Sequence, residues 1–253
     1  MAYTFSAFTN RLPDPNWTID TTGAGHASSY TAGPGFKSIK VTASQPTAVS
    51  VTNSGRVTAR SIAGHRWKIA ITYNPLTRAQ FEPIYNFLLE RRGRLKTFEV
   101  VLPQYSSPQV VGGITTVSGD LTVDGDIVAG ATNFIADNHS HATTGSLKPG
   151  DMFNITDPAN SNHKKMYRVV RVLNNTEYLT GNQPPAVDGS KHHRIYYTSP
   201  SIEKAVTDNT SNDTTLVTTN PTFRVIQEQD TREYSLGTNN LYQFSLNLIE
   251  AQP

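Results

Sequence analysis

The sequence predicts a mainly β (α+β) fold, in which a β-sheet or split barrel is covered by one helix and a small all-β domain is inserted. Three observations lead to this prediction. Apolar and polar residues alternate in several short segments, one longer segment repeats its apolar residues at helical spacing, and the chain becomes rich in Gly, Asn, Asp, Thr and Ser between residues 105 and 220.

The helix is predicted to follow Thr77. Thr77 and Gln80 have the spacing of a capping box, which satisfies free backbone groups at the start of a helix. Gly93 follows the last turn, where a residue in the left-handed conformation commonly ends a helix. The apolar residues recur at i, i+3, i+4 and i+7, namely at Phe81, Ile84, Tyr85 and Leu88. We expect this stripe to be buried against a sheet.

Strands with a two-residue period surround the helix. Residues 67–73 precede it, and residues 98–102 follow it. Residues 242–248 show the same alternation near the end of the chain, and residues 223–229 form a further strand that could pair with them through a turn around Gly237. These elements predict a core domain of residues 56–104 together with 221–253.

The middle of the chain is predicted to be the inserted domain, residues 105–220. Its short apolar runs read TTVSGDLTVDGDIVA, MFNIT, KMYRVVRVL and RIYYTSP, and turn residues separate them. This pattern predicts a small β-sandwich or β-barrel, with Asp124 and Gly125 as a hairpin turn. Residues 1–55 are predicted to form an extended N-terminal arm with a strand near residues 38–41.

Composition limits the classes of function. The 253 residues, 36% of them hydrophobic, include no Cys, so disulfides and thiolate metal sites are excluded. We expect no membrane span and no secretion signal. The net charge of +2 is too small to indicate a nucleic-acid partner. Residues 56–104 hold nine Lys/Arg and three Asp/Glu, which favours an acidic partner surface for this segment.

Candidate chemistry is sparse, and we predict no catalytic residue, cofactor or metal site. Histidines gather in the predicted insertion, but none lies at a ligand-like spacing from a carboxylate on a regular element. They are His139, His141, His163, His192 and His193. Acidic residues near Asp124 hint at calcium but lack the remaining oxygen ligands of a helix-flanked loop. The sequence has no phosphate-binding glycine loop and no nucleophile motif.

A basic cluster follows the predicted helix, formed by Arg91, Arg92, Arg94 and Lys96. Nucleic-acid binding is one interpretation, because aromatic residues lie nearby. Those aromatics fall mostly on the stripe that the helix should bury. A solvated helix end, or a contact with an acidic neighbouring subunit, is therefore favoured, and the cluster is a predicted subunit interface.

Residues 56–102 resemble the N-terminal part of distal tail proteins of long-tailed bacteriophages and gene transfer agents. In that family a strand with a basic or aromatic motif leads to a helix that closes in an Arg-Arg-Gly turn, followed by a strand with an aromatic residue. The matching positions are Gly64-His65-Arg66-Trp67, residues 81–89, Arg91-Arg92-Gly93 and Thr97-Phe98-Glu99. Residues 241–251 resemble the closing strand of the same fold. Residues 147–153 and 165–169 are similar to a β module of phage tail proteins.

The resemblance implies a structural virion component of the tail. It would form a ring, commonly a hexamer, at the distal end of the tail tube, assembled in the host cytoplasm. Its partners would be other copies of itself, the tail tube, the hub and other baseplate proteins. The resemblance implies no enzymatic activity, and a hydrolase of host polymers would need a carboxylate pair that we cannot nominate.

A second hypothesis is a carbohydrate- or receptor-binding tail protein that acts through the inserted domain. Tyrosine and histidine side chains of that domain would form its sugar platform. The nominated residues are Tyr178, His192, His193, Tyr196 and Tyr197.

Overall fold

The computed structural model describes thirteen segments of the chain. They are residues 10–14, 18–19, 31–61, 64–111, 114–115, 121–139, 147–160, 163–173, 187–188, 191–208, 214–231, 233–237 and 239–251. The chain divides into two compact units. Unit 1 comprises Met1–Val100 and Arg224–Gln252, and unit 2 comprises Val101–Phe223 with the last residue. We describe each unit by itself.

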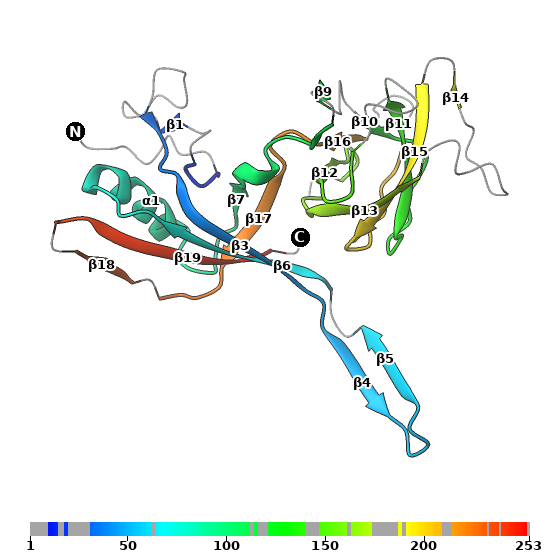
Figure 1. Ribbon diagram of the computed structural model, residues 1–253, viewed down its shortest axis with the longest axis horizontal. Helices are drawn as coiled ribbons and strands as arrows, with labels where there is room; N and C mark the ends of the chain where they lie inside the picture. The colour runs from blue at the N-terminus through cyan, green and yellow to red at the C-terminus, as the bar shows by residue number, and fades with distance from the viewer. Residues whose placement is uncertain are drawn as a thin grey trace. The chain divides into compact units, whose positions relative to one another are not determined.

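Strands are the main regular elements of the described residues (Figure 1). The elements of unit 1, including two strands that reach the boundary, are β1 (Thr18–Ile19), β2 (Thr31–Ala32), β3 (Phe36–Ser44), β4 (Thr47–Val51), β5 (Val57–Ser61), β6 (Arg66–Tyr73), α1 (Arg78–Glu90), β7 (Phe98–Val101), β17 (Thr222–Gln227), β18 (Tyr234–Leu236) and β19 (Tyr242–Glu250). Those of unit 2 are the 3-10 helix η2 (Pro103–Tyr105), β8 (Val110–Val111), β9 (Ile114–Thr115), β10 (Leu121–Val123), β11 (Asn133–His139), β12 (Met152–Thr156), β13 (Tyr167–Leu173), β14 (Val187–Asp188), β15 (Lys191–Ser199) and β16 (Thr215–Val217). The predicted mainly β fold is confirmed.

Unit 1 is built around one sheet. Its strands lie in the order β3-β6-β19-β17-β7, and β18 also pairs with β19. Within β6 every second side chain is buried, from Trp67 to Tyr73, as the two-residue period predicts. On β19 the buried side chains are Phe244, Leu246 and Leu248. One face of the sheet therefore carries the core.

Helix α1 covers that face. Among the residues of the helix, Leu88 is fully buried and Phe81 is 3% exposed. The ring of Phe81 meets that of Phe244 on β19 edge to face at 5.6 Å. Farther along, the Gln227 side chain on β17 donates a hydrogen bond to the Leu88 carbonyl at 3.2 Å. The predicted stripe is thus buried against the sheet, with Tyr85 only half-buried at its margin.

Both predicted ends of the helix are present. The Thr77 backbone N–H donates to Gln80 Oε1 at 3.1 Å, which satisfies a group at the start of the helix. After the helix, Gly93 has a φ of +65°, the conformation that glycine adopts at least cost. A side chain there would also collide with Asp230, because a Cβ atom at Gly93 would lie 2.6 Å from Asp230 Oδ1.

Part of the predicted N-terminal arm lies in the sheet. Residues 36–44 form β3, which pairs along its whole length with β6 and includes the strand predicted near residues 38–41. Residues 10–14 run beside β7, because Leu12 N–H donates to the Glu99 carbonyl at 2.8 Å. Leu12 itself is 1% exposed. These two segments are held by unit 1 of the same chain.

Unit 2 contains a closed barrel. Six strands follow one another in the order β11-β10-β16-β12-β13-β15, and β15 returns to pair with β11. Strand β14 adds to β15 outside this ring. The core includes Phe134, Phe153 and Tyr167, whose rings pack against each other in sequence at 5.8 Å between centroids. Closure leaves the ring of six strands without a free edge.

Two turns differ from the prediction. Asp124 and Gly125 do not form a two-residue hairpin, because Ile127 bridges to Val206 instead of pairing back onto β10. Asp208 holds this wider loop through the Gly125 N–H, at 2.9 Å. In unit 1 the turn at Gly237 joins β18 to β19, whereas β17 pairs with the far end of β19.

Candidate assembly surfaces

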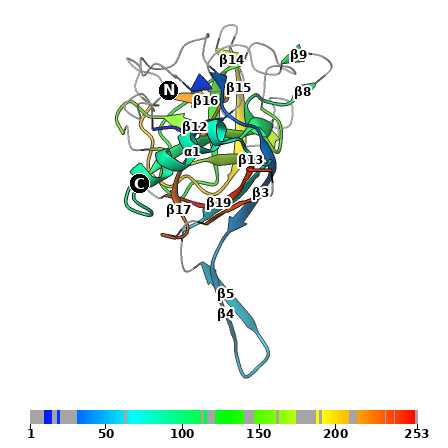
Figure 2. The same ribbon diagram turned by 90° about the vertical axis from the view of Figure 1, so that its left-hand side faces the viewer.

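The β4–β5 hairpin stands apart from the sheet of unit 1. Its strands pair with each other, and no other strand of the described residues pairs with them. The Thr52 N–H donates to the Arg56 carbonyl at 2.9 Å and closes the loop at its tip. Figures 1 and 2 show the hairpin extending beyond the ends of β3 and β6.

One face of this hairpin is apolar. Val49 lies opposite Ala59, and Val51 lies opposite Val57, so all four side chains point to the same side. The three valines are 62%, 64% and 62% exposed in chain order. An isolated two-stranded hairpin is at best marginally stable in water, and a contiguous exposed apolar face marks an interaction site. Unit 1 supplies no cover for this face in the part that the structure describes.

Sequence reasoning missed the hairpin. The segment TAVSVTNSGRVTAR alternates apolar and polar residues on both sides of Asn53-Ser54-Gly55, a recognisable turn signal. Gly55 has a φ of +77°, as such turns require. The prediction of an extended arm obscured this signal, because the arm was defined by its polar composition.

Strand β18 presents a second exposed edge. Its three residues are all exposed, with Tyr234 at 50% and Leu236 at 54%. Strand β18 pairs with β19, and no other strand of the described residues pairs with its second edge. The Tyr234 ring packs against Phe81 at 5.0 Å and Tyr85 at 5.4 Å, which anchors the edge to helix α1.

Two members of the predicted basic cluster are tied into unit 1. Arg91 donates to Asn10 Oδ1 at 2.9 Å, and its guanidinium lies 4.6 Å from the centroid of the Phe87 ring. Arg94 donates through its side chain to the Glu228 carbonyl and through its backbone N–H to Asp230 Oδ1. Both arginines therefore support the subunit's own fold.

The other two members, Arg92 and Lys96, are exposed. Arg92 has a φ of +52°, so the chain turns sharply at this point. The structure thus divides the predicted interface into two pairs of residues. Arg91 and Arg94 contact other residues of unit 1, whereas Arg92 and Lys96 are exposed. As an interface for a neighbouring subunit, the cluster stays a prediction, and it rests on these two residues.

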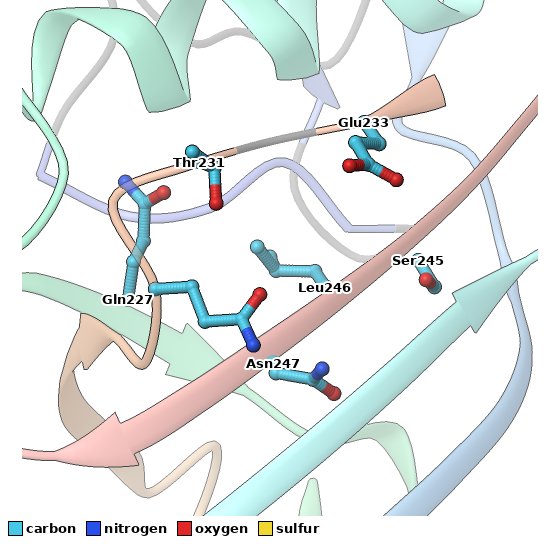
Figure 3. A pocket seen from close by; sticks show the side chains of 7 residues that line it. Gln227, Thr231, Glu233, Ser245, Leu246 and Asn247 are labelled. Atoms are coloured by element: carbon cyan, nitrogen blue, oxygen red, sulfur yellow. The ribbon is translucent and has the colours of Figure 1, made fainter. Parts of the chain in front are cut away.

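The sheet face opposite α1 is polar. On β19 the exposed side chains are Gln243, Ser245 and Asn247. Ser245 and Asn247 stand opposite Thr72 and Ala70 of β6. A hollow of about 210 Å³ lies where β17 and β18 diverge along β19. Figure 3 shows Thr231 and Glu233 across this hollow from Ser245, Leu246 and Asn247 of β19. Apart from Leu246, its lining consists of amides, hydroxyls and one carboxylate, which suits water or polar chain segments.

The predicted ligand platform is not assembled as expected. Tyr196 is fully buried, and its hydroxyl accepts a hydrogen bond from the Leu147 N–H at 3.1 Å, so it cannot stack on a sugar. Burial raises its pKa. Tyr197 is half-buried beneath the Arg171 guanidinium at 5.4 Å. Tyr178 and the side chains of His192 and His193 lie outside the described residues.

His163 is a core group of unit 2. Its side chain is buried, and Nε2 lies 2.7 Å from the Tyr167 hydroxyl. Burial lowers the pKa of His163. The Tyr167 hydroxyl also accepts the Glu203 N–H at 3.0 Å, so the pair fixes a loop beside the barrel. This arrangement is a structural polar network.

Within the described segments, no three or more His, Cys, Asp or Glu side chains group so as to hold a metal ion. No helix of those segments is long and apolar enough to cross a membrane.

Comparison with known proteins connects unit 1 to a family. Residues 24–105 match the model of the N-terminal part of the A domain of distal tail protein pb9. This match spans β3, the β4–β5 hairpin, β6, α1 and β7. The chain is also 26% identical over 191 residues to distal tail protein pb9 of Escherichia phage T5, which covers 71% of this chain and 83% of that protein. Both matches confirm the predicted resemblance of this chain to distal tail proteins of bacteriophages.

Proposed function

We propose that this protein is the subunit of a ring at the distal end of the tail tube, where it joins the tube to the baseplate or the fibres. The apolar face of the β4–β5 hairpin carries the proposal. Val49, Val51 and Val57 lie on one face of the projecting β4–β5 hairpin. Within the described residues of unit 1, no other strand pairs with this hairpin, and the three side chains are exposed. Burial of such a face in another molecule removes apolar surface from water, which drives association.

The sheet of unit 1 supports the same role. It is packed on one face by α1 and leaves strand edges and a polar face open. If the β4–β5 hairpin of one copy contacts a different surface on the next copy, the contact is heterologous. Heterologous contacts close into a ring when the rotation between neighbouring subunits is a whole-number fraction of a full turn. Six copies are the expected number from the family resemblance. The role requires binding surfaces and no catalytic group.

The proposed partners are other copies of this chain, the tail tube, the hub and other baseplate proteins. The exposed Arg92 and Lys96 are available to an acidic neighbour in this assembly. A glycan-binding role for unit 2 has weaker support, because Tyr196 is enclosed by the barrel core.

Electron microscopy of the purified protein, combined with native mass spectrometry, tests the proposal. Closed rings of one subunit number are expected. A protein that stays monomeric across the full concentration range of both measurements, and also on purified tail tubes, would contradict the proposed ring.

A further inference from the structure

We infer that the polar face of the unit 1 sheet binds a short saccharide that carries acetamido groups. The site lies where β18 meets β19 and consists of two adjoining hollows. Sugar binding at this place does not depend on the proposed ring, and it adds a binding function to the subunit.

The first hollow, of about 210 Å³, occupies a gap in the sheet. Strand β17 pairs with β19 from Glu250 to Leu248, and β18 pairs with it from Phe244 onward. On this edge of β19, no strand of the described residues pairs with Ser245 and Leu246, so space remains beside them. Amide and hydroxyl side chains line that space, namely Gln227, Gln229, Asn247 and Thr231.

A second hollow, of about 480 Å³, adjoins the first. Glu233 and Ser245 line both hollows. Figure 3 shows these two side chains toward the same end of the first hollow. Small-ligand pockets in proteins commonly measure about 300–1,000 Å³. The second hollow is within that range and the first extends it, so a short oligosaccharide is of suitable size.

The strands place polar side chains of the second hollow on one face. Ser245 lies opposite Thr72 on β6, and Gln243 lies opposite Ser235 on β18. Paired residues point to the same side of a sheet, and successive residues alternate. These four side chains therefore share the face opposite α1, and Glu233, two residues before Ser235, falls on the same face. All five residues line the second hollow.

Lys37 bounds the second hollow from the edge strand β3. The pairing of β3 with β6 shifts between Phe36 and Ser38, so Lys37 is the extra residue of a bulge. A bulge turns a side chain out of the regular alternation. Lys37 and Glu233 are both exposed, and neither forms an ion pair within the described residues. Both charges are available to a ligand.

The lining matches the polar groups of an N-acetylated sugar. A carboxylate accepts hydrogen bonds and an ammonium group donates them, so Glu233 and Lys37 can both bind sugar hydroxyls. The side-chain amides of Gln229 and Asn247 donate and accept, as an acetamido group also does. A ligand that has both hydroxyls and amides therefore uses the whole lining.

Other classes of ligand fit this lining less well. Glu233 is the single carboxylate in the lining of either hollow, which is too few for a calcium or magnesium site. The Tyr73 ring stacks on Phe244, and the Tyr234 ring packs against Phe81 of α1. These aromatic residues provide no apolar pocket for the side chains of a bound peptide. Because no ring is free to stack on a sugar, we expect dissociation constants in the millimolar range.

Saturation-transfer difference NMR on the full-length protein tests the site with two sugars. N,N′,N″-triacetylchitotriose carries acetamido groups, and maltotriose is the matched sugar without them. Transfer to the acetyl methyl groups of the first sugar is expected, and maltotriose should give a signal at least about threefold weaker. No transfer to either sugar would overturn the inference. Equal transfer to both would overturn the assignment to acetamido groups.

Single substitutions locate the bound sugar. Glu233→Gln and Asn247→Ala should each weaken binding of triacetylchitotriose by about fivefold, because each removes a hydrogen-bonding group from the lining. Ser245→Tyr fills the space that the two hollows share and should abolish binding. Thr42→Ala is the matched control, because Thr42 is exposed opposite Lys68 on the same face and lies outside both linings.

Two further measurements separate the possible outcomes. Trp fluorescence during urea unfolding shows that unit 1 of each variant is folded. A folded Ser245→Tyr variant that binds triacetylchitotriose like the unmodified protein would overturn the inference. Loss of binding in Tyr197→Ala and not in Glu233→Gln would place the sugar on unit 2 and overturn it as well. Native mass spectrometry follows the ring separately, so rings without sugar binding would contradict this site alone.

Discussion

The sheet of unit 1 is open, and the barrel of unit 2 is closed. In unit 1, β18 has an unpaired edge among the described residues, and the β4–β5 hairpin exposes Val49, Val51 and Val57. In unit 2 the β11–β15 pairing joins the two ends of the six-strand ring. Unit 2 also has exposed valines, Val128 and Val170, but they are single residues on different elements.

The difference indicates where assembly contacts belong. Open strand edges and a contiguous apolar face invite other chains, whereas closure uses the backbone groups within the molecule. The match to the family model, over residues 24–105, falls on unit 1 except for its last five residues. We therefore propose that the assembly contacts of this chain lie in unit 1, and we expect unit 2 to fold with little dependence on neighbours.

The largest effect is expected from core substitutions that address one unit each. Phe87→Ala removes a fully buried ring that meets Phe98 edge to face at 5.5 Å, and should lower the free energy of unfolding of unit 1 by about 3–5 kcal/mol. Phe153→Ala is the counterpart in unit 2. Both Trp residues belong to unit 1, so Trp fluorescence during urea unfolding reports that unit, and far-UV circular dichroism reports both.

Phe87→Ala should shift the fluorescence transition to lower urea, and Phe153→Ala should leave it in place while shifting the second part of the dichroism curve. If either variant shifts the fluorescence and the dichroism transitions together, the two units unfold as one. That result would contradict the treatment of unit 1 and unit 2 as separate folding units.

A smaller effect is expected from the basic cluster. Arg91→Ala removes the hydrogen bond to Asn10 and the contact with the Phe87 ring, and should cost about 1–2 kcal/mol of unit 1 stability. Arg92→Ala should change stability by less than about 0.5 kcal/mol, because Arg92 is exposed. Urea unfolding followed by Trp fluorescence measures the stability of both variants. If both lose the same free energy of unfolding, the distinction between a supporting Arg91 and an exposed Arg92 is wrong.

Unit 2 offers a test with paired tyrosines. Tyr196→Phe leaves the Leu147 N–H without its acceptor and should destabilise unit 2 by about 1 kcal/mol. Tyr197→Phe should be near neutral, since Tyr197 is only half-buried. The dichroism transition of unit 2 measures the difference. If the Tyr197 change is the more costly one, the assignment of Tyr196 to the core is wrong.

The smallest effect is a pH dependence in unit 2. Burial lowers the pKa of His163 in the folded protein, so the unfolded chain binds the proton more readily. Its contribution to stability is complete above the unfolded-state pKa of about 6.5 and is lost as the pH falls below it. His163→Gln should flatten the decline of unit 2 stability between about pH 7.5 and pH 5.5. An unchanged slope would mean that other groups cause the decline.

Much of unit 1 could be predicted from the sequence because its signals are local. The period of two in β6 and the cap at Thr77 each report a preference of neighbouring residues. Four predicted runs of unit 2 overlap β10, β12, β13 and β15 for the same reason, whereas β11 and β16 were not predicted. The sequence did not distinguish a β-sandwich from a closed barrel. The β11–β15 pairing that closes the barrel joins residues about 60 positions apart and leaves no local pattern.

The candidate sites were harder to predict than the fold. Arg91 and Arg94 read as free cations in the sequence, and only the fold places Asn10 and Glu228 beside them. Tyr196 was predicted to be part of a ligand platform, yet the barrel turns its side chain inward. Whether a side chain of a strand is exposed depends on which face of the strand points outward. A short run of sequence does not by itself reveal that face.

Sedimentation velocity on three forms of the full-length protein tests the central claim most directly. The hairpin variant V49S/V51S/V57S removes the apolar face of unit 1, and V128S/V170S removes exposed valines of unit 2 as the matched control. The unmodified protein and the unit 2 variant should sediment as the same closed oligomer, and the hairpin variant should sediment as a folded monomer. A hairpin variant that assembles like the unmodified protein would contradict the account.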